Sequence, residues 1–410
     1  MSSIPAHREM AISLEEYSQR RRRIVELAKD RGLAGLLVWS RGGPAVDWYG
    51  DVLYLAGHHS PIGQIPDHRA WSGRAHSALI LPVDGEATLV VDLPDYSPEH
   101  VSVADVRTTV HVPTTAAQVL REKGLDRRRI GLAGRETLLH NAYGLMVKEL
   151  DHELGLEPVD DLLQTLRMIK SPAELELIRH ATSVGVGWMN TMMEAAIAGN
   201  TEGDFVGEGL RYFASHGGAL YDVAVASGPN SNHFQHVGVP PSWDSTRPLE
   251  RGDLVHVDAW GPVNGYYTDF VRSTVVGRKA TSAQREVLEG SVSIIEHIID
   301  GIRPGVIVGD LYERGSEWLV TNGFGEHVSQ ESGTYFGELW PAFGHGLGLG
   351  LESPWIAKDE ATVLKEHMVL AVEALVGKPD VGAAGFEQDV IVTSGGVEVL
   401  TAGCPSRWWD

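Results

Sequence analysis

Residues 252–273 read GDLVHVDAWGPVNGYYTDFVRS. We predict two strands here, DLVHVDAWG and a second that includes GYYTDFVRS, because both runs are rich in β-branched and aromatic residues. Two acids, Asp258 and Asp269, lie within or at the ends of these apolar strands. Strand interiors disfavour acids, and a buried acid is rarely left unpaired. The segment therefore predicts a sheet that carries a functional site.

Two more acids and a histidine follow in similar settings. Glu373 interrupts the apolar run MVLAVEALVG, Glu387 stands near the start of FEQDVIVT, and His345 lies in FGHGLGLGLESP. A single acid in a strand more often forms a salt bridge than binds a ligand. Four carboxylates on neighbouring strands, however, would repel one another unless a positive charge lay between them, since buried charges are normally paired or metal-bound. The pattern predicts a pair of divalent metal ions. GHGLGLG lacks the GxGxxG spacing of a dinucleotide-binding loop.

The order of strand and helix signals predicts two domains, residues 1–165 and 166–410. The first has an α/β pattern, with strands at 33–40, 76–82, 87–92 and 128–134 and a helix at 116–124. In the second, Ser171 and Pro172 start a long helix that ends at Gly199, and Thr201 with Asp204 starts another. The chain is β-rich from residue 221, and we expect its strands to form one sheet with helices at 281–302 and 308–323.

Composition excludes several classes of partner. The 410 residues include 34 Lys and Arg against 55 Asp and Glu, a formal net charge of −21, which disfavours nucleic acid and anionic membrane surfaces. The single cysteine, Cys404, permits no intrachain disulfide. We find no signal-peptide core and no apolar stretch of the ~20 residues that span a membrane. We therefore expect a cytoplasmic protein. The acidic net charge also favours reading the basic run at 20–23 as a solvated helix face.

These segments resemble the "pita-bread" metalloenzymes, the family that includes prolidase, aminopeptidase P, methionine aminopeptidase and creatinase. LRMIKSPAELELIRHA resembles the helix that enters their catalytic domain, and ASGPNSN resembles the loop after the first catalytic strand. The 11-residue spacing between Asp258 and Asp269 is similar to that of the peptidases. The resemblance covers nearly the whole chain and implies a creatinase-like N-terminal α/β domain, an α+β pita-bread catalytic domain and a homodimer.

The resemblance also implies a set of metal ligands. Asp258 would bind one ion, His345 and Glu373 the other, and Asp269 and Glu387 would bridge them. Two ions held in this way would activate a water and polarise a substrate carbonyl. A carboxylate-rich set with one imidazole suits Mn, Co, Zn or Fe.

Other family positions match less closely. The substrate histidine after the GPN loop would be His236 after a one-residue insertion, with His233 as the alternative. Seven residues after the metal histidine, where the peptidases have another histidine, this chain has Glu352. Arg272 matches an arginine beside the metal site and would orient it.

The predicted function is hydrolysis of a C–N bond in a small amide or dipeptide, similar to an Xaa-Pro dipeptidase. Catalytic roles fall to His236, Glu352, Arg272 and a proton shuttle, Glu373 or Glu387. A glutamate at position 352 is also similar to the sequence pattern of dimethylsulfoniopropionate lyases, which share this fold. These lyases carry a further aspartate at the position where this chain has Trp260. A metal-dependent lyase of a small zwitterion and a non-peptidase amide hydrolase are therefore alternatives, as is a non-catalytic binding module.

Overall fold

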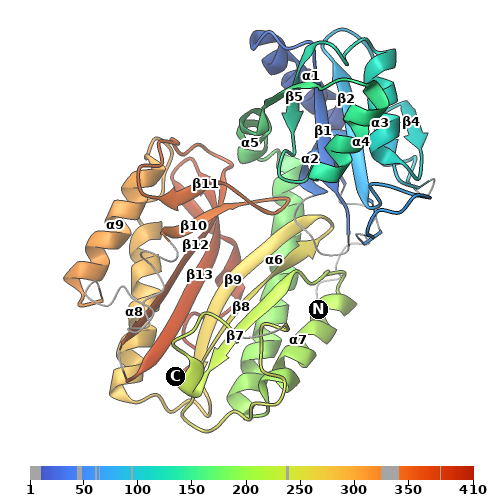
Figure 1. The fold of residues 1–410 in the computed structure, drawn as a ribbon. Coiled ribbons are helices and arrows are strands. Elements are labelled where there is room, and N and C mark those ends of the chain that lie inside the picture. Colours follow the sequence, from blue (N-terminus) through green and yellow to red (C-terminus); the bar gives the residue numbers. More distant parts are fainter. Residues whose placement is uncertain are drawn as a thin grey trace. The chain divides into compact units, whose positions relative to one another are not determined.

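The computed structural model describes residues 11–43, 49–60, 62–63, 65–93, 96–236, 240–324, 341–378 and 380–410. The chain divides into two compact units, Met1–Arg167 and Met168–Asp410. We call them the N-terminal and C-terminal domains and describe each by itself (Figure 1). Among the described residues, no helix is both long enough and apolar enough to cross a bilayer.

The N-terminal domain is built on one six-stranded sheet with the strand order β4-β3-β2-β1-β5-β6. Its strands are β1 (Gly35–Arg41), β2 (His76–Pro82), β3 (Thr88–Val91), β4 (Asp105–Thr108), β5 (Arg129–Ala133) and β6 (Gly155–Pro158). Its helices are α1 (Leu14–Asp30), α2 (Gly50–Ala56), α3 (Val112–Glu122), α4 (His140–Leu150) and α5 (Asp160–Met168), the last of which ends just past the domain boundary. The predicted α/β pattern is confirmed, although α3 begins four residues before its predicted start.

The prediction of a solvated basic face was wrong for Arg20. Its side chain is buried, and its guanidinium lies 4.1 Å from the ring centroid of Tyr54 and donates to the Tyr54 carbonyl at 3.2 Å. The reason is helical periodicity, because Arg20 shares one face of α1 with the buried Tyr17 and Ile24. An arginine can occupy such a face when a carbonyl accepts a hydrogen bond from its guanidinium and an aromatic ring makes a cation–π contact with it.

The C-terminal domain begins with the two helices that the capping signals predict. Helix α6 (Pro172–Ala198) starts at a capping box formed by Ser171 and Glu174, and it ends at Gly199, whose φ is +83°. Helix α7 (Glu202–Ser215) starts at a second capping box, formed by Thr201 and the Asp at position 204. The reciprocal hydrogen bonds satisfy backbone N–H groups that the first turn would otherwise leave unpaired, and this fixes both starts.

The β-rich region forms two sheets, so the prediction of a single sheet was wrong. One is antiparallel with the order β7-β8-β9, and comprises Asp222–Ser227, Leu254–Val263 and Tyr266–Val275. The other has the order β11-β10-β12-β13-β14, and comprises β10 (Ala342–Leu347), β11 (Leu351–Ala357), β12 (Val369–Lys378), β13 (Gly382–Thr393) and β14 (Gly396–Val399). Strand signals give no pairing partners, so they could not distinguish one sheet from two.

The two sheets pack between helices. Helix α6 packs on β9 and on α7, whereas α8 (Ser282–Ile299) packs on β12 and β13 and on α9 (Val308–Thr321), as Figure 1 shows. The sheets approach each other closely where Gly385 of β13 faces Val271 of β9. A Cβ atom at Gly385 would lie 2.6 Å from Val271 Cγ1, so this approach requires glycine.

Candidate metal centre

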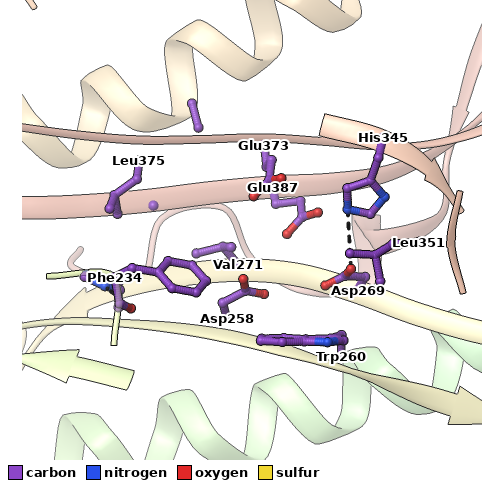
Figure 2. Close-up of a pocket in the computed structure, with 13 residues that line it drawn as sticks. Phe234, Asp258, Trp260, Asp269, Val271, His345, Leu351, Glu373, Leu375 and Glu387 are labelled. Carbon is purple, nitrogen blue, oxygen red and sulfur yellow. Dashed lines mark hydrogen bonds and ion pairs between the residues drawn. The ribbon is translucent and has the colours of Figure 1, made fainter. Parts of the chain in front are cut away.

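The five predicted metal ligands converge between the two sheets (Figure 2). Asp258 on β8 and Asp269 on β9 come from the three-stranded sheet. His345 on β10, Glu373 on β12 and Glu387 on β13 come from the five-stranded sheet. Glu373 and Glu387 are direct cross-strand partners, which puts their side chains on the same face. Each sheet thus contributes two acids to the site, and the five-stranded sheet adds the histidine.

The ligand atoms form two overlapping groups. Asp269, His345 and Glu387 make one group, and Asp258, Glu373 and Glu387 make the other, with the ligand atoms of each group within 4.8 Å of one another. Glu387 belongs to both groups, as a bridging ligand must. Asp269 belongs to one, and its Oδ2 lies 3.6 Å from His345 Nε2. Glu373 is grouped with Asp258 in this arrangement, whereas the family resemblance pairs it with His345.

The donors fit a pair of divalent cations. Neither carboxylate oxygen of Glu387, nor Asp258 Oδ1, has a hydrogen-bond partner among the residues that the structure describes, and all three atoms are buried. Buried acceptors of this kind are costly unless a cation satisfies them. The four carboxylates and one neutral imidazole would balance the charge of two divalent ions.

Burial and mutual repulsion both act on the protonation of these acids. Burial raises the pKa values of Asp258, Asp269 and Glu387 well above their usual range, and the neighbouring carboxylates raise them further. Burial lowers the pKa of His345 to about 4, so the imidazole is neutral. His345 Nδ1 donates to the Gly346 carbonyl at 2.9 Å, which leaves the lone pair on Nε2 for a metal.

A cavity of about 320 Å³ opens beside the carboxylates. Its lining includes all five predicted ligands and eight further residues, Phe234, His256, Trp260, Val271, Leu351, Ala374, Leu375 and Gly385. His256 was not predicted. It precedes Asp258 by two positions on β8, and residues two apart on a strand share a face, so strand periodicity could have found it.

The two candidate substrate histidines lie on the segment that follows the GPN turn. The His233 side chain is exposed and the His236 side chain is half-buried. Within the described part of the chain, neither residue lines the cavity. Phe234, between them, does line it.

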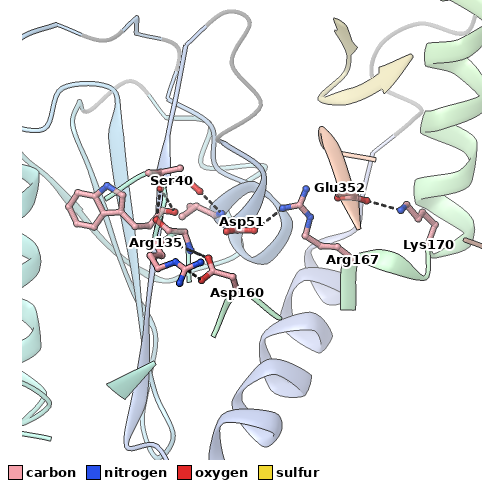
Figure 3. Close-up of polar contacts among 11 residues, drawn as sticks. Ser40, Asp51, Arg135, Asp160, Arg167, Lys170 and Glu352 are labelled. Carbon is pink, nitrogen blue, oxygen red and sulfur yellow. Dashed lines mark hydrogen bonds and ion pairs between the residues drawn. The ribbon is translucent and has the colours of Figure 1, made fainter. Parts of the chain in front are cut away.

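Glu352 forms a buried ion pair. Its Oε1 lies 2.7 Å from Lys170 Nζ, and the two side chains are 8% and 1% exposed (Figure 3). Its neighbour Leu351 lines the cavity. The register of β10 and β11 shifts on both sides of His345, so counting seven residues along the chain does not identify the side chain that faces the metals.

Arg272 is fully buried and contacts backbone oxygens and aromatic rings. Its guanidinium donates to the carbonyls of Glu387 at 2.6 Å and Pro405 at 3.0 Å and to Gln388 Oε1 at 2.9 Å. It also stacks near the Phe386 ring, 4.5 Å from the centroid. It therefore fixes the backbone that carries Glu387, and it does not line the cavity.

One more acid lies behind the ligands. Asp389 is fully buried on β13, and its Oδ2 accepts from the backbone N–H of Asp269 at 3.5 Å and from Thr182 Oγ1 at 3.4 Å. Burial raises its pKa well above the usual range. It follows Glu387 by two positions on β13, so strand periodicity could have placed it on the same face as that candidate ligand.

Comparison with known proteins shows the family of the chain. The model of metallopeptidase family M24 matches residues 176–394, more than half of the chain, and the creatinase/prolidase N-terminal domain matches residues 20–169. The chain belongs to metallopeptidase family M24 and carries a creatinase-like N-terminal domain. It is a hydrolase of that metallopeptidase family, with the pita-bread catalytic fold.

The chain is also similar to individual relatives and to solved structures. The chain is 29% identical to the Xaa-Pro dipeptidase of Pyrococcus furiosus over 258 residues, which covers 62% of this chain and 69% of that protein. It is 26% identical over 403 residues to the probable dipeptidase PepE of Mycobacterium tuberculosis, covering 95% and 96% of the two chains. The prolidase structure from Pyrococcus horikoshii has a TM-score of 0.75 at 22% identity, with 93% and 98% of the chains covered. This likeness shows the fold.

Proposed function

We propose that the C-terminal domain is a dinuclear metal-dependent hydrolase that cleaves the C–N bond of small Xaa-Pro dipeptides. The observation that carries the proposal is the shared position of Glu387 in two groups of buried ligand atoms. Asp269 and His345 would hold one ion with Glu387, and Asp258 and Glu373 would hold the second. Two bound divalent ions would lower the pKa of a shared water and polarise the substrate carbonyl.

The chain's own groups can move the proton. Of the five ligands, Glu373 alone is half-buried, whereas the other four are buried. A carboxylate that borders the cavity can accept a proton from the attacking water and deliver it to the leaving nitrogen. We therefore assign the proton shuttle to Glu373 in preference to Glu387, whose oxygens are fully enclosed.

The cavity favours a small substrate. Its volume of about 320 Å³ lies at the lower end of the range for ligand pockets. The dipeptidase names of the relatives agree with a dipeptide-sized substrate. We retain Mn, Co, Zn and Fe as candidate ions, because the donor set alone does not discriminate among them.

The test is hydrolysis of a panel of Xaa-Pro dipeptides by Mn-loaded protein, with Asp269→Ala as the control. Metal-dependent release of proline that the variant lacks is the expected result. A metal-replete protein that releases no proline contradicts the proposal. The same samples are then assayed for an alkene product from a small zwitterion, which would indicate the lyase alternative, and for cleavage of non-peptide amides.

A further inference from the structure

His256 connects the metal-bearing strand to the segment that closes one end of the cavity. The imidazole is 1% exposed and lies on β8, two residues before Asp258. Its Nε2 is 3.1 Å from the carbonyl oxygen of Phe234. A carbonyl can only accept, so Nε2 carries a proton and donates it. The hydrogen bond joins two cavity-lining residues that are 22 positions apart in the chain.

Further contacts anchor the described segment around Phe234 on both sides of that residue. Ser231 packs so closely on the start of β13 that a Cβ atom at Gly382 would lie 2.3 Å from Ser231 Oγ. At the other end, the His236 N–H donates to the Ser242 carbonyl at 3.3 Å. Between these points, the bond from His256 holds the Phe234 backbone against the sheet.

Phe234 forms an apolar wall at one end of the cavity. Figure 2 shows its ring beside Val271 and Leu375, on the opposite side of the carboxylates from His345 and Leu351. Val271 and Leu375 each follow a predicted metal ligand, Asp269 or Glu373, by two positions, so strand periodicity turns them into the same cavity.

We propose that His256 is a positioning residue that sets substrate specificity by holding Phe234 over the metal centre. The end of the cavity bounded by Phe234, Val271 and Leu375 then takes an uncharged aliphatic group of the substrate. This inference rests on the proposed function, since it describes what the same site selects. His256 acts through the Phe234 backbone, and the Phe234 ring makes the contact.

Binding of straight-chain hydroxamates tests the proposal without any hydrolysis. The head group binds metal ions, and the alkyl tail of acetohydroxamate through hexanohydroxamate reports on the apolar wall. Calorimetry on the Mn-loaded wild-type protein is expected to show affinity rising about fourfold per methylene while the tail remains in contact with the wall. Phe234→Ala is expected to remove this dependence. Leu351→Ala, at the other end of the cavity, is the matched control and is expected to retain it.

Two replacements of His256 separate positioning from general disruption. In His256→Gln the amide nitrogen reaches the place of Nε2 and can still donate to Phe234, so the length dependence is expected to persist. In His256→Asn the shorter amide cannot reach, and the dependence is expected to fall to that of Phe234→Ala, with bound manganese unchanged. The double variant Phe234→Ala/His256→Asn is expected to bind the hydroxamates no more weakly than Phe234→Ala alone.

The outcomes distinguish this inference from the proposed function. Absence of manganese uptake by the wild-type chain contradicts the proposed metal centre. Manganese uptake without a length dependence contradicts the apolar subsite. Equal behaviour of His256→Gln and His256→Asn, or loss of manganese from His256→Asn, contradicts positioning through Phe234. A length dependence in a protein that cleaves no Xaa-Pro peptide supports the subsite and contradicts the activity.

Discussion

Lys170 Nζ lies 2.7 Å from Glu352 Oε1, and both side chains are almost fully buried. The pair links the start of α6 to β11, where Glu352 is the cross-strand partner of Gly346, next to the metal-ligand candidate His345. The ion pair, drawn in Figure 3, thus holds β11, which pairs with the strand that presents the imidazole.

Breaking this pair from one side should destabilise the protein. Lys170→Met leaves a buried carboxylate without its ammonium partner, and we expect a loss of about 3 kcal/mol in the free energy of unfolding. The double variant Lys170→Met/Glu352→Met removes both charges and should recover most of that loss. Urea unfolding of the three proteins measures the difference. A double variant less stable than Lys170→Met would contradict this account.

Arg272 should be irreplaceable by lysine. Arg272→Lys keeps the charge but loses the planar set of donors that reaches Glu387, Gln388 and Pro405 at the same time. We expect about 2 to 4 kcal/mol of destabilisation and weaker manganese binding, because the Glu387 backbone loses its support. Thermal unfolding and equilibrium dialysis provide the two readouts. Unchanged manganese affinity in the folded variant would mean that Arg272 does not position the ligand.

The metal-free protein should gain stability when the shared ligand loses its charge. Burial and the neighbouring acids raise the pKa of Glu387, so its ionised form is unfavourable in the folded state. Folded acids with raised pKa values bind more protons than the unfolded chain, so their contribution to stability falls as the pH rises above the usual carboxylate range. We expect Glu387→Gln to stabilise the metal-free protein by about 1 to 2 kcal/mol at pH 7.

The matched control for that measurement is Glu176→Gln, which removes an exposed carboxylate paired with Arg179 on the surface of α6. Surface pairs of this kind contribute little to stability, so the control should unfold with the wild type. Equal unfolding midpoints for Glu387→Gln and the wild type, both without metal, would contradict the repulsion among the ligands.

The N-terminal domain should lose stability in mild acid. Burial lowers the pKa of His76 from 6.5 to about 4, and its Nδ1 accepts from Trp39 Nε1 at 2.6 Å. Between pH 6.5 and pH 4 the unfolded chain binds a proton that the folded state does not, so stability falls as the pH falls through this window. The loss approaches about 3 kcal/mol at pH 4. His76→Gln should reduce the slope of the free energy of unfolding against pH, measured by urea unfolding at several pH values, and an unchanged slope would contradict the assignment.

Much of the site follows from local sequence. Acids in apolar strands single out Asp258, Asp269, Glu373 and Glu387 as candidate ligands, because a buried carboxylate requires a partner, and the structure brings all four to one cavity. The capping boxes at Ser171 and Thr201 were equally local, and their predicted positions are confirmed.

Features that depend on contacts between distant segments could not be predicted from the sequence. The pairing of strands into two sheets depends on contacts between distant segments, and the carbonyl that accepts from the buried Arg20 belongs to the distant Tyr54. The choice between Leu351 and Glu352 as the residue that lines the cavity depends on register shifts beside His345. A shift of one residue reverses which side chain faces the metals, and no sequence spacing records it.

The central claim is that one residue, Glu387, is shared by two metal ions. Equilibrium dialysis against manganese, followed by elemental analysis of the protein, tests it most directly when the wild type and Glu387→Gln are compared. We predict two ions per wild-type chain and loss of both from the folded variant, because Glu387 belongs to both ligand groups. A variant that retains two ions with wild-type affinity would contradict the account.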